Sequence, residues 1–562
     1  MNILGVYPVS HEFGHDTGAA IVSNGKIIAA AEEERFTRRK HDTSAPRNSI
    51  AFCLNYAKLG MDDIDYIAVP WSPKLWLKYK MMHKQTDFFH NILDFLVFPV
   101  RSHPARFRKK ASLLSSYFDY DYFNQTLEKF SPLPPISYYE HHRAHAATAF
   151  YASNFDSASI VTVDGQGELN STVSWKGNGS KISKLREEPV SNSLGYFYHY
   201  ATQYLNLGFN GEGKTMGLAP YGSPDAEMEK KLRQHMDAKG GKWYNITKMM
   251  PDQSVLGFPK RSNEDIMGAN YRNYAFHVQK MLEEAMLRVV EDAVSSSGER
   301  KLCLSGGVAL NCTTNSKILE SGMVDDLFVF PAASDGGSPV GAALECASEN
   351  GEKVNFRLEH PYFGPEFSDA EIENALKRFG LKYEECKDIS GTVGELIHKA
   401  NVIGWFQGRM ELGPRALGNR SIIADPTNSK MLEKVNNVKQ RESWRPLAPS
   451  MLFEAKDEYL ENARDSPFMI LSFTVKKEKR KEVPAIVHVD GSTRPHTVKR
   501  AVNRKYYDAI KAFENSGGVP IVMNTSFNVG NEPVVCTPED AIRTFYSSML
   551  DYLAIGSFLV KK

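Results

Sequence analysis

"ILGVYPVSHEFGHDTGAAIVSNGKIIAAAEEE", at residues 3–34, follows a plan that recurs at 159–188 as "SIVTVDGQGELNSTVSWKGNGSKISKLREE". Each stretch begins with an apolar strand and passes through a turn containing Gly and Asp into a second strand. A hairpin turn, "SNGK" in one copy and "GNGSK" in the other, then leads to a third strand of alternating apolar residues. Helical sequence follows both copies, so the repeat predicts a duplicated α/β fold.

This repeated unit resembles the two halves of the actin/hexokinase/sugar-kinase ATPase fold, in which a nucleotide lies between the halves. The alternative is a pair of ordinary hairpins in another α/β protein. Two later strands favour the ATPase-like fold, because one ends at Ser305-Gly306-Gly307 and the next leads to Asp335-Gly336-Gly337 before a helix of small residues. Glycines before a helix present backbone N–H groups to phosphate or adenosine, although a lone Gly pair often marks only a tight turn.

Length and charge restrict the class of protein. The chain has 562 residues, 42% of them hydrophobic, and a formal net charge of +1, which predicts several globular domains and no binding of nucleic acid or anionic membrane. The six cysteines show no CxxC spacing, which is typical of reduced thiols rather than disulfides. The N-terminus lacks the pattern of a signal peptide, and no apolar run is long enough to span a bilayer. We therefore expect a soluble, cytoplasmic protein.

A domain boundary is predicted at about 350–368, where "SENGEKVNFRLEHPYFGPEF" is rich in turn formers. Ser368 and Glu371 then form a capping box for a new helix. The expected domains are 1–360 and 368–562. The segment 72–130 has no counterpart in the other half of the repeat; its basic run at 101–110 is interpreted as a solvated helical insertion rather than a binding surface.

"YEHHRAHAATAFYAS" at 139–153 contains a candidate metal-ligand pair. On a helix His141 and His145 lie one turn apart on the same face, whereas His142 points elsewhere. A metal needs more ligands than two imidazoles, and Asp164 and Asp335 each follow an apolar strand that the duplicated fold directs into its cleft. Such a His-His-Asp-Asp set suits iron, zinc or manganese. An isolated HxxxH pair is more often part of a protein core, so the prediction depends on the two aspartates.

A second cluster of polar residues lies in the C-terminal domain, in "GWFQGRMELGPRALGNRSIIADP" (404–426) and "VKQRESWRPLAPS" (438–450). Its basic residues are Arg409, Arg415, Arg420, Lys439, Arg441 and Arg445. Farther on, "GSTRPHTV" supplies Arg494, and a strand leads to Asn524 and Asn528. Guanidinium groups on turns bind phosphate or carboxylate in a bidentate manner. Structural pairing with carboxylates is the alternative, but Asp and Glu are too few here to pair every arginine.

Several motifs together resemble the O-carbamoyltransferases of antibiotic and nodulation-factor biosynthesis, the family of the tobramycin and cephamycin enzymes. They occur in order from about residue 2 to the C-terminus, and only 72–130 lacks a counterpart. The motifs are "HDTGAAIVSNGKIIAAAEEERFTRRKH", "HHRAHA", "VDGQGE", "GKTMGLAPYG", "SGGVALN", "ASDGGSPVGAA", "GPRALGNRS", "SWRPLAPS", "STRPHTV" and "NTSFN".

The resemblance implies a two-domain enzyme. Its N-terminal domain would be similar to the tRNA threonylcarbamoyltransferase, an ATPase-like fold with a bound metal, and its C-terminal α/β domain would be YrdC-like. Carbamoyl phosphate and ATP, with Mg²⁺, would form carbamoyl adenylate in the C-terminal domain. The carbamoyl group would then be transferred in the N-terminal domain to a hydroxyl of a small-molecule natural product.

The resemblance also implies roles for individual residues. Iron would be bound by His141, His145, Asp164 and Asp335. His15 and Lys40 would lie at the transfer centre, and Gly165, Gly307 and Asn311 would bind carbamoyl adenylate. Carbamoyl phosphate and ATP would be held by Arg415, Lys439, Arg445, Arg494, Asn524 and Asn528.

The expected chemistry agrees with these roles, because a carbamate is a weak electrophile that needs a leaving group such as AMP, and because a metal and Lys40 can stabilise developing negative charge. His15 is the candidate base for the acceptor hydroxyl, with Asp16 as its orienting partner, although it could instead bind the nucleotide. Other functions remain open, namely an ATPase-fold small-molecule kinase, a nucleotide-gated binding or chaperone protein, and a tRNA-modifying transferase. The acceptor, the metal, the pathway and the oligomeric state cannot be read from the sequence.

Overall fold

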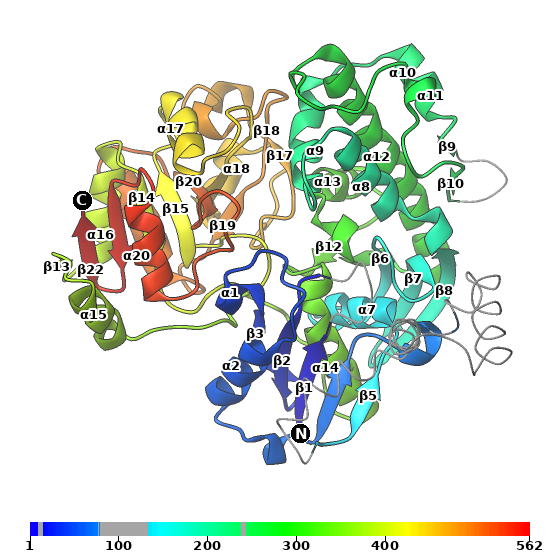
Figure 1. Cartoon of the computed structure of the whole chain (residues 1–562), viewed down its shortest axis with the longest axis horizontal. Coiled ribbons are helices and arrows are strands. Elements are labelled where there is room, and N and C mark those ends of the chain that lie inside the picture. Colours follow the sequence, from blue (N-terminus) through cyan, green and yellow to red (C-terminus); the bar gives the residue numbers. More distant parts are fainter. Residues whose placement is uncertain (9–14, 77, 79–132, 238–242) are drawn as a thin grey trace, which may run out of the picture.

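The structure, a computed structural model, describes residues 1–8, 15–76, 78, 133–237 and 243–562. Most of the 72–130 insertion, including its basic run, lies outside these residues. The described residues form two five-stranded sheets in the first two thirds of the chain and an eight-stranded sheet in the rest, with two further two-stranded sheets (Figure 1).

The first sheet has the strand order β3-β2-β1-β4-β5. Strands β1 to β3 form antiparallel pairs, whereas β4 and β5 extend the sheet by parallel pairing. β1 is buried along nearly its whole length, which explains its continuous apolar sequence. The strand bounds are β1 Asn2–Tyr7, β2 Gly18–Ser23, β3 Lys26–Glu32, β4 Tyr66–Val69 and β5 Ile136–Tyr138.

The second sheet repeats this arrangement in the order β8-β7-β6-β11-β12. Here too the first three strands pair antiparallel and the last two pair parallel. The shared order confirms the predicted duplication and the actin/hexokinase-like fold. The strand bounds are β6 Ser157–Val163, β7 Asn170–Asn178, β8 Lys181–Pro189, β11 Lys301–Ser305 and β12 Asp326–Val329.

Two helices, α7 (His141–Tyr151) and α14 (Ser338–Glu349), lie between the sheets. α7 packs on β6 and β11, α14 packs on β1, β2 and β4, and the two helices pack on each other (Figure 1). Every side chain of α7 except Arg143 is buried, as expected for a core helix. A Cβ atom on Gly341 would lie 1.9 Å from the carbonyl oxygen of Ala144, so glycine allows this close crossing.

Other helices cover the outer faces of these sheets or lie at their ends. The 29-residue α12 packs against β6 and β7, and α2 packs against β2 and β3. Their bounds, with the smaller elements of this part of the chain, are α1 Glu34–Thr37, α2 Arg47–Ala57, α8 Leu194–Tyr204, α9 Glu212–Leu218, α10 Ala226–Leu232, β9 Met236–Asp237, β10 Asn245–Ile246, α11 Gln253–Leu256, α12 Ala269–Ser297 and α13 Cys312–Glu320.

The C-terminal part forms an eight-stranded mixed sheet in the order β13-β22-β21-β14-β15-β20-β16-β19. It has its own apolar core, and the predicted capping box of Ser368 and Glu371 is present at the start of α15. Its strands are β13 Glu384–Glu385, β14 Ile403–Phe406, β15 Arg420–Ala424, β16 Ala448–Leu452, β19 His496–Val498, β20 Ile521–Ser526, β21 Tyr552–Ile555 and β22 Phe558–Lys561, with β17 Phe473–Thr474 and β18 Ser492–Thr493 as a separate pair. Its helices are α15 Asp369–Arg378, α16 Ile389–His398, α17 Lys430–Val438, α18 Lys456–Tyr459, α19 Arg504–Asn515 and α20 Pro538–Tyr546.

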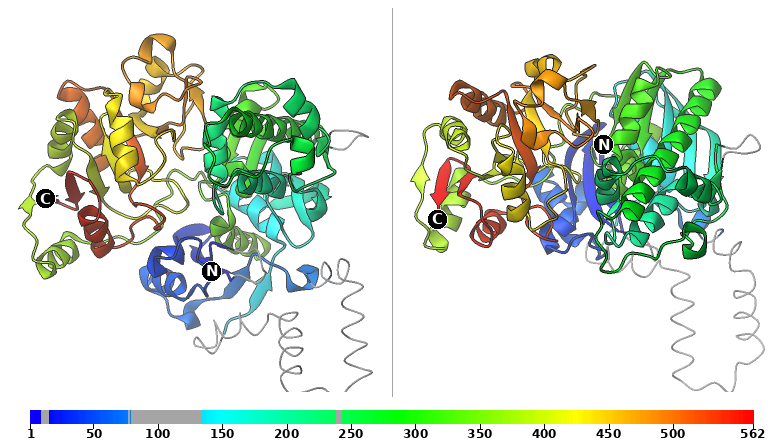
Figure 2. Two further views of the ribbon diagram at one scale, coloured as in Figure 1. Left: turned by 45° about the horizontal axis from the view of Figure 1, so that its top comes forward. Right: turned by 90° about the horizontal axis from the view of Figure 1, so that it is seen from above.

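The C-terminal part contacts both halves of the duplicated fold (Figures 1 and 2). Next to the first sheet, Arg35 donates to the Gly413 carbonyl, and the Gly413 N–H donates to Glu32. Next to the second half, Tyr221 donates to the Trp444 carbonyl. No helix within the described residues is long and apolar enough to cross a membrane.

Candidate metal and anion sites

Helix α7 brings the two predicted histidine ligands together. His141 and His145 are both buried, and their Nε2 atoms lie 3.0 Å apart on one face of the helix. Two imidazole lone pairs at this separation in a buried place repel each other unless a proton or a cation lies between them. The helical i, i+4 spacing therefore produces the geometry expected of a ligand pair.

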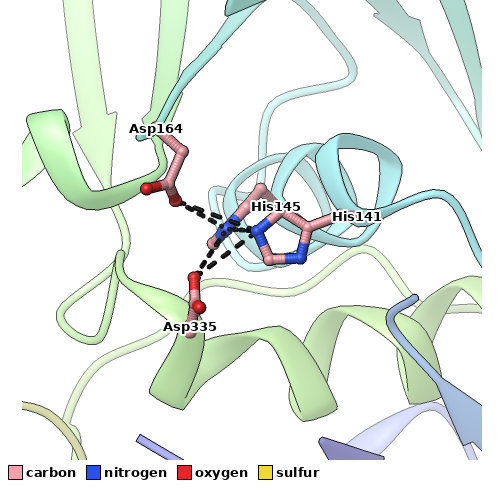
Figure 3. A group of neighbouring side chains, drawn as sticks. All are labelled: His141, His145, Asp164 and Asp335. Carbon is pink, nitrogen blue, oxygen red and sulfur yellow. Dashed lines mark hydrogen bonds and ion pairs between the residues drawn. The ribbon is translucent and has the colours of Figure 1, made fainter. Parts of the chain in front are cut away.

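Two carboxylates complete the cluster (Figure 3). Asp164 follows β6, and its Oδ2 lies 3.1 Å from His145 Nε2 and 3.9 Å from His141 Nε2. Asp335 begins the short turn before α14, and its Oδ1 lies 3.4 Å from His141 Nε2 and 3.7 Å from His145 Nε2. The structure thus brings together all four residues that the sequence nominated.

These separations fit a bound metal ion. The four candidate donor atoms all lie within 4.8 Å of one another. Metal–ligand bonds of about 2.0 to 2.2 Å place neighbouring ligand atoms about 3 to 3.5 Å apart, depending on the coordination angle. Two imidazoles and two carboxylates also offset the charge of a divalent cation, so the residues present fit a divalent transition metal.

Neighbouring groups hold the donor atoms in place. His141 Nδ1 lies 3.3 Å from the Pro70 carbonyl, and His145 Nδ1 lies 3.3 Å from the Ser305 hydroxyl. These contacts direct both Nε2 atoms toward the cluster, as outer partners do at metal sites. On the other side, the Tyr7 hydroxyl donates to Asp335 over 2.8 Å.

Charge compensation governs the protonation of the cluster. Burial favours the neutral form of His141, but Asp335 and Asp164 outweigh it and raise its pKa well above the usual value. Burial opposes ionisation of Asp335, yet the histidines hold its pKa well below the usual range. The cluster is therefore ready to exchange imidazole protons for a cation.

His142 points away from the cluster, as predicted, and has a structural role. Its Nδ1 bonds to the Thr162 hydroxyl at 3.0 Å and its Nε2 to the Asn170 carbonyl at 2.9 Å. Burial, followed by the charge of His141, lowers the pKa of His142 to about 3. The ring is a neutral core histidine.

A cavity of about 410 Å³, here called the transfer cavity, opens beside the cluster. Asp164 and Asp335 form part of its wall, as do His15 and the predicted adenylate-binding residues Gly165, Gly307 and Asn311. Burial favours a neutral His15, but the adjacent Asp16 carboxylate raises the pKa of His15 to about 10. His15, the metal-type cluster and the glycines therefore share one space.

Glycine also shapes this wall from helix α8. A Cβ atom on Gly195 would lie 2.6 Å from the Gly165 nitrogen and 2.7 Å from the Asp164 carbonyl carbon. Any larger residue would displace the backbone that holds Asp164. Gly195 could not be identified from the sequence, because its importance depends on how α8 packs against the loop after β6.

A second cavity of about 210 Å³, here called the cationic pocket, lies between α9 and the C-terminal sheet. Four arginines and one lysine line it. They are Lys214, Arg415, Arg441, Arg445 and Arg494. Asn524 also lines the pocket, with its Oδ1 buried and unpartnered among the described residues.

The cations of this pocket are mostly unpaired. Glu442 is the one carboxylate that contacts them among the described residues, at 3.4 Å from Lys214 and 3.7 Å from Arg445. Arg494 has no hydrogen-bond or ion-pair partner within the described chain. Burial, together with the charges of Arg445 and Arg494, lowers the pKa of Arg441 to about 9. Such crowding of like charges is costly and is relieved by a polyanionic ligand.

Two of the clustered arginines do not line this pocket. Arg420 is buried, donates to the carbonyls of Gln407 and Pro365, and covers the Phe406 ring. Arg409 donates to the carbonyls of Ile28 and Phe363. Both arginines therefore have a structural role. The structural alternative considered from the sequence was pairing with carboxylates, whereas the partners found here are backbone carbonyls.

Lys439 and Asn528 lie next to the cationic pocket and not on its wall. The buried Lys439 ammonium donates to the Ser526 carbonyl at 2.6 Å and to the Asn528 side-chain oxygen at 2.5 Å. Burial, then the charge of Arg441, lowers the pKa of Lys439 well below the usual value. The pair supports the loop that follows β20.

Lys40, which was predicted at the transfer centre, is not on the wall of either cavity. Desolvation lowers its pKa, and the charges of Arg445 and Lys214 add to the shift. The two cavities adjoin, because Pro414 lines both. The role of Lys40 at the transfer centre stays a prediction.

Two residues near these cavities, Lys214 and His41, were not predicted as site residues from the sequence. Lys214 stands in the quoted motif "GKTMGLAPYG" without an assigned role, although a lysine in a glycine-containing stretch is a signal for anion binding. His41 was part of "RRKH" and now lies on the wall of the transfer cavity.

Comparisons with known families cover most of the chain. The family model for the carbamoyltransferase N-terminus matches residues 2–344, and the model for the carbamoyltransferase C-terminus matches residues 394–562. Nodulation protein NolNO of Sinorhizobium fredii is 37% identical over 98% of this chain and 79% of its own. Nodulation protein NolO of Bradyrhizobium diazoefficiens is 39% identical over 75% of this chain and 78% of its own.

Similarity to solved structures is distant. HypF of T. kodakarensis has a TM-score of 0.32 and 13% identity, over 62% of this chain and 47% of its own. Component A of the Acidaminococcus fermentans (R)-2-hydroxyglutaryl-CoA dehydratase has a TM-score of 0.30 and 12% identity, over 62% of this chain and 99% of its own. The family matches, which extend over both parts of the chain, show that this protein belongs to the carbamoyltransferase family and is a transferase enzyme.

Proposed function

We propose that the protein is an ATP-dependent O-carbamoyltransferase with two connected sites. Carbamoyl phosphate and ATP would form carbamoyl adenylate in the cationic pocket, within a YrdC-like domain at 368–562. The carbamoyl group would then be transferred in the domain at 1–360. The observation that carries this proposal is the contact of two unlike cavities at Pro414, one with unpaired cations and one beside a metal-type cluster.

Formation of carbamoyl adenylate from carbamoyl phosphate and ATP, the activation step, requires two bonds to be broken. Water cleaves carbamoyl phosphate to carbamate and phosphate, and a carbamate oxygen then attacks the α-phosphorus of ATP while pyrophosphate leaves. The guanidinium groups of Arg415, Arg445 and Arg494, with the Asn524 amide, are suited to holding these anions. Mg²⁺ would accompany ATP. Lys439 and Asn528 support the pocket from behind rather than touching the ligands.

In the transfer step the acceptor oxygen attacks the carbamoyl carbon, its proton moves to His15, and the bond to AMP breaks. Gly165 and Gly307 leave the backbone accessible to the adenylate, and Asn311 lies on the same wall. His141, His145, Asp164 and Asp335 would hold a divalent metal, such as Fe²⁺, which supplies Lewis-acid stabilisation of developing negative charge. Asp16 is the main cause of the raised pKa of His15, and Asp335 and Asp164 add to it. A cation bound to Asp335 and Asp164 would therefore lower the pKa of His15, in the direction that a base requires.

The acceptor is proposed to be a small hydroxylated molecule. The transfer cavity has a volume of about 410 Å³, which is the size of small-molecule sites rather than of nucleic-acid interfaces. The net charge of +1 gives no support for a tRNA acceptor. A metabolite kinase of the same fold would not need the cationic pocket of the C-terminal sheet.

One experiment separates these possibilities. The purified protein is incubated with ATP and Mg²⁺, with or without carbamoyl phosphate, and pyrophosphate and ADP are measured. The proposal predicts pyrophosphate only when carbamoyl phosphate is present. Formation of ADP that depends on an added hydroxyl compound would favour a kinase. Release of pyrophosphate in the absence of carbamoyl phosphate would contradict the proposal that carbamoyl phosphate is the carbamoyl donor.

A further inference from the structure

Asp16 lies between two imidazoles on the wall of the transfer cavity. Its Oδ2 lies 2.9 Å from His15 Nδ1, and its Oδ1 lies 2.8 Å from His41 Nδ1. The two rings are 5.9 Å apart and meet edge to face at 72°. Each oxygen of one carboxylate is thus assigned to a different histidine, and all three side chains face the same space.

The backbone holds this arrangement at a conformational cost. Asp16 and His41 have φ values of 59° and 56°, in the left-handed region that residues other than glycine seldom adopt. A residue in this conformation persists only where its surroundings fix it, most often at functional sites. Because two strained residues meet at one carboxylate, their contact is not a by-product of regular structure.

Further contacts hold the segment of His41 to its own helix and to the segment of Asp16. The backbone N–H of His41 donates to Glu34 Oε2 over 2.6 Å, and the Thr17 N–H donates to the Asp42 carbonyl over 3.3 Å. The Thr37 hydroxyl also bonds to the Asp42 carboxylate. The loop after α1 is therefore fixed to that helix, and the Thr17–Asp42 bond links it to the start of β2 beside the Asp16–His41 contact.

The hydrogen-bond pattern assigns different tasks to the two rings. An Nδ1–H that donates to Asp16 leaves the Nε2 of His15 as the atom that accepts a proton, which is how a carboxylate orients a catalytic imidazole. A carboxylate with only one partner can turn about its terminal torsion, which is broad and roughly two-fold. The second donor, from His41, removes that freedom.

We infer that His41 is a positioning residue, which fixes the Asp16 carboxylate so that His15 presents Nε2 to the acceptor hydroxyl. This inference rests on the proposed function, in which His15 is the base. His41 itself exchanges no proton with the substrate. Its contribution is to the rate of transfer and not to the binding of carbamoyl adenylate.

Two substitutions of similar size separate positioning from packing. His41→Asn keeps an N–H donor at the place of Nδ1, because the amide nitrogen of Asn is the same number of bonds from Cα. His41→Leu fills the space without a donor. We expect kcat for transfer to fall about 10- to 100-fold in His41→Leu, the range typical of lost outer-shell contacts, and to stay within about 5-fold of normal in His41→Asn.

The test uses chemically prepared carbamoyl adenylate with water as the acceptor, and AMP release is measured. Water attacks the carbamoyl carbon, its proton passes to His15, and AMP leaves. KM for carbamoyl adenylate should be unchanged in both variants, and so should pyrophosphate formation from carbamoyl phosphate and ATP, which also shows that the variants are folded. Equal losses in His41→Asn and His41→Leu, or no loss in either, would overturn the inference.

A spectroscopic measurement tests the same contact without turnover. The downfield proton NMR signal of the His15 Nδ1–H, identified by its loss in His15→Gln, should be retained in His41→Asn and shifted or lost in His41→Leu. An unchanged signal in His41→Leu would overturn the positioning role. If the wild-type protein formed no pyrophosphate from carbamoyl phosphate and ATP, the proposed function itself would fail, a result distinct from either of these.

The alternative role of the three residues is a second metal site, since two imidazoles and a carboxylate can form one. Metal content of the His141→Ala/His145→Ala double variant distinguishes the two roles. No bound metal in that variant supports hydrogen-bonded positioning. If the double variant binds one equivalent of metal, and this metal is lost when His41→Leu is combined with it, then His41 is a ligand and the inference is overturned.

Discussion

The metal-type cluster and the cationic pocket use charge in opposite ways. In the cluster, two histidines and two aspartates lie within 4.8 Å of one another, so each charge has a partner of opposite sign. In the cationic pocket, four arginines and Lys214 share a single contacting carboxylate, Glu442, among the described residues. One site is compensated by its own side chains, whereas the other leaves positive charge unpaired.

This difference in charge bears on what we propose each site binds. A compensated cluster of imidazole and carboxylate loses little by exchanging protons for a metal cation, and it keeps a fixed geometry for chemistry. An uncompensated group of guanidinium groups gains most when a polyanion enters. The difference in charge supports our proposal that phosphate-bearing substrates bind in the cationic pocket and that a metal binds at the cluster beside the transfer cavity.

The largest effect should follow from breaking the cluster. His145→Ala removes one of two imidazole ligands, so the metal should be lost and carbamoyl product should fall at least about a thousand-fold. Metal content by mass spectrometry and product formation are measured together. The exposed His398→Ala serves as the control and should keep both. Full metal occupancy in His145→Ala would contradict the ligand assignment.

The next effect should come from the unpaired charge of the cationic pocket. Arg494→Ala should remove about 2 to 5 kcal/mol of transition-state stabilisation from the activation step. The rate of carbamoyl-phosphate-dependent pyrophosphate release should therefore fall at least about 30-fold. The matched control is Arg300→Ala, because Arg300 is half exposed and pairs with Asp325 on the surface. Equal rates in the two variants would show that Arg494 holds no substrate.

A smaller effect is expected from the backbone behind Asp164. Gly195→Ala would place a Cβ atom 2.6 Å from the Gly165 nitrogen, so Asp164 must shift. We expect metal affinity to fall about 10- to 100-fold, with pyrophosphate release unchanged. Gly60→Ala, whose Cβ would meet only Asp63 at 3.6 Å, is the control. Normal metal affinity in Gly195→Ala would show that the loop adjusts.

The smallest effect concerns acid stability of the C-terminal part. His496 is buried, and burial lowers its pKa to about 3. Between that value and the unfolded pKa of about 6.5, the unfolded chain binds one more proton, so stability falls as pH drops from about 6.5 toward 3. The loss is at most about 1.4 kcal/mol per pH unit.

His496→Phe tests this sign, because it keeps a ring against Tyr506 but cannot be protonated. Urea unfolding of both proteins is compared at pH 7, 6 and 5. The variant should be less stable at pH 7, where it lacks the contact with the Ser450 hydroxyl, and should lose less stability on acidification. Parallel losses would mean that His496 is not the titrating group.

Local sequence patterns predicted the duplicated sheets and the metal-type cluster. Hairpin turns fix their strands locally, and the i, i+4 spacing of His141 and His145 is set by the helix. Asp164 could be nominated because it follows a buried strand. These features depend on short-range rules, which is why they could be read without the structure.

Contacts between distant segments could not be predicted in the same way. Arg420 and Arg415 stand in the same motif, yet one bonds to buried carbonyls and the other lines the cationic pocket. The position of each arginine depends on how the chain folds around Glu411, whose carboxylate accepts hydrogen bonds from the N–H groups of Leu417 and Asn419. The contact of His41 with Asp16 likewise joins two loops whose meeting depends on tertiary packing.

The most direct test measures the activation and the transfer half-reactions separately in one variant of each site. Arg445→Ala and His145→Ala are assayed for carbamoyl-phosphate-dependent pyrophosphate release, and then for product when carbamoyl adenylate is supplied. We predict that Arg445→Ala loses pyrophosphate release but forms product from supplied adenylate, and that His145→Ala releases pyrophosphate but forms no product. Rescue of His145→Ala by adenylate, or normal pyrophosphate release in Arg445→Ala, would contradict the division of activation and transfer between the two sites.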